Sequence, residues 1–91
     1  MTEPCYRVRR QGVVWSDTAR DAVVLDLEQS AFFGINATGV QLWRLLLDGA
    51  NRTELVARLR AVGAPAERAA ADTDAFLHAL AADGLVEDVP R

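Results

Sequence analysis

The sequence is short of the residues on which most catalytic and metal sites depend. It contains one cysteine, Cys5, and one histidine, His78, and neither an HExxH nor a CxxC spacing occurs. The usual ligand set of a zinc site is therefore missing, and a single cysteine cannot form an internal disulfide. No glycine-rich phosphate-binding loop is present either. These absences predict a chain that is not an enzyme and that holds no metal and no cofactor.

Long apolar runs and an excess of basic residues are also missing. No apolar run approaches the ~20 residues of a transmembrane helix, and the start lacks the charged and apolar regions of a signal peptide. The formal net charge is -3, which provides no electrostatic attraction to nucleic acid or to an anionic membrane. We therefore expect a cytoplasmic protein that binds neither of them.

The composition that remains is that of one compact domain over residues 1–91, because 51% of the residues are hydrophobic. Residues 1–12 are interpreted as an arm whose order the sequence leaves open, with Cys5 as a free thiol on it. Residues 13–16 are β-branched and aromatic, and residues 22–27 alternate with period two, as strands do. After a polar break, a third strand is expected to consist of Ala31, Phe32, Phe33, Gly34 and Ile35.

The second half of the chain has helical spacing. Asn36 or Thr38 can cap a first helix, and Asn51 opens a second through a capping-box pattern with Glu54. A third helix is expected from about residue 65 to residue 83. The predicted fold is α+β, a three-stranded antiparallel sheet followed by three helices. The second helix is expected to bury Leu55, Val56, Leu59 and Val62.

The third strand is unusual for the edge of a sheet. It has aromatic neighbours on both faces, a glycine within it, Gly34, and no lysine or proline that would keep a further strand from pairing with it. Such an edge is either covered, here by the N-terminal arm, or used by a peptide that adds a further strand. Both readings remain open at this point.

Three stretches of sequence form a combined pattern: FGIN at residues 33–36, TGxxLW with a following DG over residues 38–49, and DxxxFLxxLxxxGLV at residues 72–86. This pattern resembles the PqqD-like peptide chaperones, which are winged-helix leader-recognition elements for ribosomally made, modified peptides. Among them, the short form is most similar to the leader-binding protein of lasso-peptide pathways. Gly34 is a departure, since relatives often carry a larger residue there.

The resemblance implies a winged-helix-like fold in which the leader adds as a fourth strand beside the third strand and lies against the third helix. It also implies three partners: a precursor leader peptide, a separate cysteine leader protease, and a cyclase as a further candidate. The positions that match the peptide-binding residues of the family are Ala31, Phe32, Phe33, Gly34, Ile35, Asp72, Ala75, Phe76 and Ala79.

Periodicity adds detail to this expected site. Phe33 and Ile35 share one face of their strand, and Phe76 lies on the inward stripe of the third helix, so all three should face the same space. Ala75 and Ala79, one turn apart, are expected to leave a shallow groove for an apolar side chain.

The same fold type also occurs in DNA-binding regulators, which are the alternative function. A recognition helix should be basic, but the third helix carries Glu67, Asp72, Asp74 and Asp83 against the single Arg68. An ion pair between Arg68 and Asp72, four residues apart, would explain one of these charges without any function.

A third hypothesis is a structural subunit that docks an acidic partner. It would use Arg52, Arg58 and Arg60 of the second helix, which otherwise form a solvated face.

Overall fold

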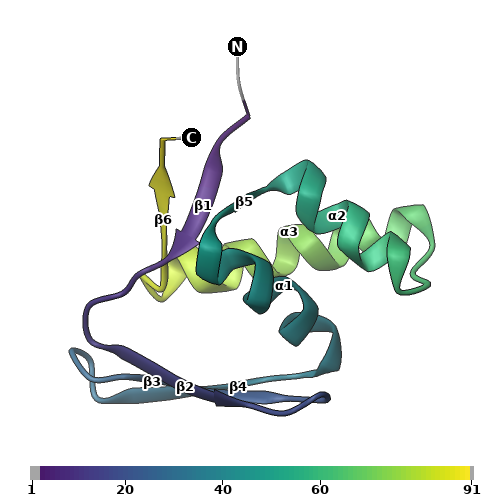
Figure 1. Cartoon of the computed structure of the whole chain (residues 1–91). Coiled ribbons are helices and arrows are strands. Elements are labelled where there is room, and N and C mark those ends of the chain that lie inside the picture. The colour runs from purple at the N-terminus through teal and green to yellow at the C-terminus, as the bar shows by residue number, and fades with distance from the viewer. Residues whose placement is uncertain (1–2, 91) are drawn as a thin grey trace.

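The computed structural model describes residues 3–90, which form three helices and two antiparallel sheets (Figure 1). The sheets contain β2, β3 and β4 in one case and β5, β1 and β6 in the other. The predicted α+β class is confirmed, and the winged-helix description is approximate because of the second sheet. In chain order the elements are β1 (Cys5–Val8), β2 (Val13–Asp17), β3 (Ala22–Asp26), β4 (Ala31–Ile35), α1 (Ala37–Asp48), β5 (Ala50–Asn51), α2 (Arg52–Ala61), α3 (Ala66–Ala82) and β6 (Val86–Val89).

The sheet of β2, β3 and β4 is the meander that the period-two pattern predicts. Val24 in the central strand lies opposite Trp15 on one side and Phe33 on the other. β4 has the predicted bounds, Ala31–Ile35, and lies at the edge of this sheet. One face of the sheet packs on the helices, and the other is solvent-exposed and apolar (Figure 1). The large exposed side chains on that outer face are Val14, Val23, Leu25 and Phe32.

The second sheet corrects the interpretation of residues 1–12 as an arm, because residues 5–8 are a strand. β1 pairs antiparallel with β6, with Cys5 opposite Val89 and Val8 opposite Val86. Cys5 is a free thiol but is buried in this sheet, only 5% exposed, rather than carried on a loose segment. The partner strand comes from the other end of the chain, so no local sequence pattern predicts the pairing. Residues 1 and 2 of the predicted arm lie outside the described residues.

Side-chain capping places the first two helices where the sequence predicts them. Of the two possible caps of α1, the structure uses Asn36, whose side-chain oxygen accepts the Gly39 N–H at 2.9 Å. The capping box of α2 is confirmed: Asn51 accepts the Glu54 N–H at 2.8 Å, and Glu54 accepts the Asn51 N–H at 2.9 Å. These bonds satisfy N–H groups that a helix start otherwise leaves without partners.

The core lies between the inner face of the β2–β3–β4 sheet and the helices. The fully buried ring of Trp43 meets the ring of Trp15 edge-on, with 5.9 Å between centroids. From α2, Leu55 and Leu59 are buried as predicted. Val62 is 53% exposed, contrary to prediction, because it is the C-cap residue and lies beyond the last turn of the helix.

Candidate functional site

The direction of the backbone groups in β4 follows from hydrogen bonds at the two ends of the β2–β3 hairpin. The Leu27 N–H donates to the Gly12 carbonyl at 2.7 Å, and the Thr18 N–H donates to the Asp21 carbonyl at 2.8 Å. Hydrogen-bonded and non-bonded pairs alternate along an antiparallel ladder. Positions 23 and 25 of β3 therefore bond to β2, and the remaining positions of β3 direct their N–H and C=O groups toward β4.

The same alternation determines which groups of β4 are free. Ala31, Phe33 and Ile35 lie opposite the β3 positions that face β4, so their backbone groups bond to β3. Phe32 and Gly34 consequently direct their N–H and C=O groups outward, to an edge that no strand within residues 3–90 occupies. β1 pairs in the other sheet, so the N-terminal arm does not cover this edge as a fourth strand. Two donors and two acceptors are thus available to an extended partner.

A hollow of about 320 Å³ lies where the end of β4 and the first turn of α1 face α3. Its α3 wall is low, since two of its residues are exposed alanines one turn apart. The four α3 positions expected from the family resemblance all belong to this wall. The complete lining consists of Asn36, Thr38, Gly39, Leu42, Asp72, Ala75, Phe76 and Ala79.

Gly39 brings the end of β4 and α3 together. A Cβ atom at this position would lie 2.5 Å from Cγ2 of Ile35 and 2.9 Å from Cε1 of Phe76, so only glycine permits the contact. Ile35 and Phe76 therefore both lie against Gly39, and Phe33 packs against the buried core. The sequence pattern includes Gly39 but does not predict its role in packing. The available signal was a glycine on the buried side of a helix, which indicates that other residues approach the helix backbone closely there.

A larger hollow, about 590 Å³, lies on the other side of Thr38 and Asp72, which line both hollows. Its remaining walls come from the first turn of α1, the end of α2 and the start of α3, including Val62 and Arg68. The predicted ion pair between Arg68 and Asp72 is not among those formed within residues 3–90. Asn36, the residue that follows β4, lines the smaller hollow and not this one, so the smaller hollow is the better candidate site.

The opposite flank of α3 is engaged with α2. Nε and Nη2 of Arg52 donate to the two carboxylate oxygens of Asp74 at 2.7 and 3.0 Å. The hydrogen bond from Arg52 lowers the pKa of Asp74, and the bond to Asp74 raises the pKa of Arg52. Arg58 donates to the Gln41 side-chain oxygen at 3.0 Å. Two of the three arginines expected to dock an acidic partner thus have partners within the chain.

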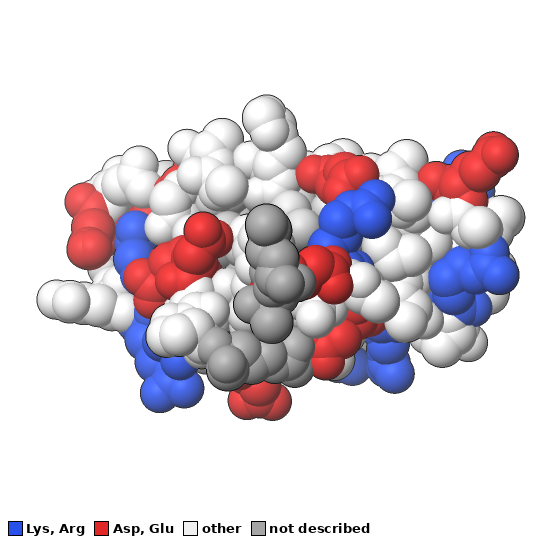
Figure 2. Space-filling model, turned by 90° about the horizontal axis from the view of Figure 1, so that it is seen from above, with Lys and Arg blue, Asp and Glu red and all other residues white. Residues whose placement is uncertain are grey.

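Residues 3–90 form neither a basic surface for nucleic acid nor a cluster of metal ligands. Figure 2 shows basic and acidic side chains interspersed over the face seen from above, whereas a nucleic-acid interface needs a continuous basic stripe. Within residues 3–90, no group of three histidine, cysteine, aspartate or glutamate side chains could hold a metal ion. In the same range, no helix is long and apolar enough to cross a bilayer.

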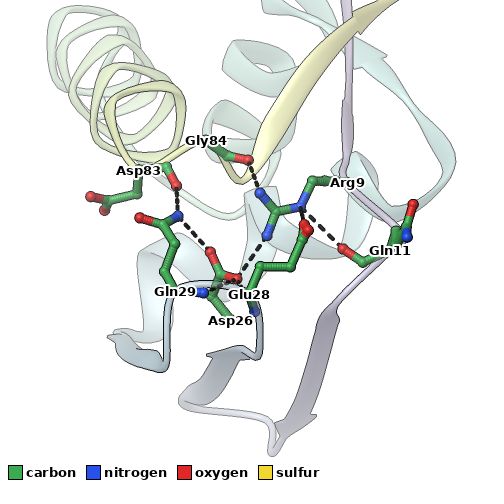
Figure 3. Close-up of polar contacts among 7 residues, drawn as sticks. All are labelled: Arg9, Gln11, Asp26, Glu28, Gln29, Asp83 and Gly84. Atoms are coloured by element: carbon green, nitrogen blue, oxygen red, sulfur yellow. Dashed lines mark hydrogen bonds and ion pairs between the residues drawn. The ribbon is translucent and has the colours of Figure 1, made fainter.

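A buried carboxylate organises the turn between β3 and β4 (Figure 3). Asp26 is fully buried and accepts hydrogen bonds from Arg9 Nη2 at 2.8 Å and from Gln29 Nε2 at 2.7 Å. The same Gln29 amide donates to the Asp83 carbonyl at 3.0 Å, and Arg9 Nη1 donates to the Gly84 carbonyl at 3.0 Å. Burial alone would raise the pKa of Asp26, but the hydrogen bonds from Arg9 and Gln29 and the charge of Arg9 lower it. Asp26 is therefore ionised at neutral pH.

Three comparisons with known proteins bear on this geometry. The family model described as "Coenzyme PQQ synthesis protein D (PqqD)" matches residues 21–86, a range that contains β3, β4 and all three helices. Among solved structures, "TbiB1 in Complex with the TbiA(beta) Leader Peptide" superposes with a TM-score of 0.79 and is 28% identical. The match covers 93% of this chain and 99% of that chain. A search of curated proteins gave no match.

Proposed function

The chain belongs to the PqqD family, and we propose that it binds the leader segment of a ribosomally made precursor peptide and presents it to separate enzymes. The observation that carries the proposal is the open edge of β4 beside a groove on α3. Support also comes from the structural neighbour, which was solved with a leader peptide bound. In this proposal the chain is a recognition protein, and the chemistry belongs to its partners.

The proposed mode of binding is strand addition along β4. The outward N–H and C=O groups of Phe32 and Gly34 would form up to four backbone hydrogen bonds, each worth roughly 0.5–1.5 kcal/mol net. An apolar leader side chain in the groove between Ala75 and Ala79 would contribute roughly 1.5–3 kcal/mol through burial. Backbone bonds do not depend on the peptide sequence, so selectivity falls to the groove. Phe76 forms its floor, and Asp72 can accept a hydrogen bond from a leader amide or polar group.

A finer proposal concerns the pathway. The resemblance to the lasso-peptide branch supports delivery of the bound leader to a separate cysteine protease, with a cyclase then closing the core peptide. Residues 1–91 would act as one leader-binding domain in the cytoplasm.

Equilibrium binding tests the proposal. A short precursor reading frame is first sought beside this gene; its leader, synthesised and labelled with fluorescein, is the probe, and the readout is fluorescence polarisation. We expect saturable binding with a Kd of tens of micromolar or tighter, about 6 to 7 kcal/mol or more. A peptide of the same composition in shuffled order should not saturate, because the groove selects an apolar side chain at one register. Equal binding of both peptides, or none by the leader, would contradict the proposal.

A further inference from the structure

We infer that Arg9 and Gln29 are positioning residues for leader binding: they tether the β3–β4 turn to the end of α3 and so set the separation of β4 from α3, between which a leader strand would lie. This inference rests on the proposed function and concerns residues that do not line the groove. The tether comprises Asp26, which both side chains bind, and the Asp83 and Gly84 carbonyls, to which they also donate.

β4 and α3 are joined at two places, one near each end of β4. β4 begins two residues after Gln29, at the turn that the tether joins to the C-terminal end of α3. β4 finishes at Ile35, which lies against Gly39 of α1, and Phe76 of α3 lies against the same glycine. The separation of β4 from α3 is therefore set at two points, and on α3 Ala79 lies between them while Ala75 directly precedes Phe76. Loss of the tether would remove one of these two points and leave the one at Gly39.

The groups that the tether joins explain why it needs hydrogen-bond donors such as arginine and glutamine. The last carbonyls of a helix have no partner within the helix, and the C-terminus carries partial negative charge, so N–H donors and cations are favoured there. Arg9 and Gln29 supply such donors to the end of α3, whose last turn contains no basic residue of its own. Their other partner, Asp26, is a buried carboxylate, and a buried charge is costly without its hydrogen bonds. Asp26 also accepts the backbone N–H groups of Glu28 and Gln29, but only the Arg9 and Gln29 side chains link it to the Asp83 and Gly84 carbonyls among the hydrogen bonds of residues 3–90.

Gln29→Glu tests the tether with almost no change of shape. The new carboxylate would face the Asp26 carboxylate and the Asp83 carbonyl, both acceptors, so two attractive contacts become repulsive. If β4 and α3 then have the separation that binds the leader in about a tenth of the molecules, leader affinity falls about tenfold. The matched control is Gln11→Glu, which makes the same charge change at an exposed side chain. Polarisation titrations at a temperature where each variant is fully folded measure both.

Amide NMR spectra of the leader-free protein separate this inference from the proposed function. We expect Gln29→Glu to shift the amide resonances of β4 and of the neighbouring part of α3, including Gly34, Ala75 and Ala79, whereas Gln11→Glu should leave them in place. If these resonances do not shift, or if folded Gln29→Glu binds the leader with the affinity of the parent protein, the inference is wrong. Gln29→Ala, which removes the donors without adding charge, should show the same shifts and serves if the glutamate variant does not fold. Failure of the parent protein to bind the leader would instead overturn the proposed function.

Discussion

Replacing Gly34 with proline is expected to weaken leader binding by roughly 1 to 3 kcal/mol while the domain remains folded. The Gly34 N–H faces the open edge of β4, so proline removes a donor that a paired leader would use without removing a bond to β3. The proline ring also occupies the edge at which the leader would lie. Edge strands tolerate proline where the missing N–H faces solvent, which is the case here. Polarisation titration with the labelled leader measures the loss.

Gly34→Ala is the matched control for this variant. A Cβ atom at position 34 would meet no atom within 4 Å, and alanine keeps the N–H. We therefore expect the alanine variant to bind the leader as the parent does. Circular-dichroism melts should give similar melting midpoints for the parent, the proline variant and the alanine variant. A proline variant that is folded and binds with parent affinity would show that the leader does not pair with β4.

Filling the groove on α3 is expected to have a comparable effect. Ala75→Phe or Ala79→Phe should each weaken leader binding by roughly 1 to 3 kcal/mol, the usual range for overpacking a filled site. Both alanines are exposed in the free protein, so the melting midpoint should barely change. Asp72→Ala should act more mildly, because it removes one contact and adds no bulk. The measurement is the same titration, with a thermal melt of each variant.

Ala81→Phe provides the control for added aromatic surface. Ala81 is exposed on α3 but does not line the groove, so this variant should bind the leader normally. If both groove variants bind as tightly as the parent, the groove assignment is wrong. The flank that carries Leu77 and Ala81 would then be the next surface to test, since Asp74 on that side is already paired with Arg52.

The elements that could be predicted from the sequence are those that local signals encode. Alternation in residues 22–27 and capping by Asn36 and Asn51 act over a few residues, and the structure has the corresponding strand and helices. The edge strand could be recognised because it lacks the lysine or proline residues that usually prevent pairing at an exposed sheet edge. The α3 positions of the groove depended on the family resemblance together with helical periodicity, and the structure brings them to one hollow.

The features that could not be predicted depend on partners far away in the sequence. β1 is a strand because β6 pairs with it, and β6 comes from the opposite end of the chain. Asp26 lies on the face of β3 that is buried, although the opposite face, with Val23 and Leu25, is the more apolar one, so alternation alone does not show that Asp26 is buried. Its partner Arg9 precedes β2 and is joined to it only by folding. A buried acid at such a position is a signal that a cation must be near, although it does not say which one.

Hydrogen exchange of the β4 amides, followed by NMR with and without saturating leader, tests strand addition most directly. In the free protein the amides of Ala31, Phe33 and Ile35 should already be protected by their bonds to β3, whereas those of Phe32 and Gly34 should exchange readily. Leader binding should then slow exchange at Phe32 and Gly34. A leader that saturates the protein and leaves both of these amides exchanging as before would contradict strand addition at β4.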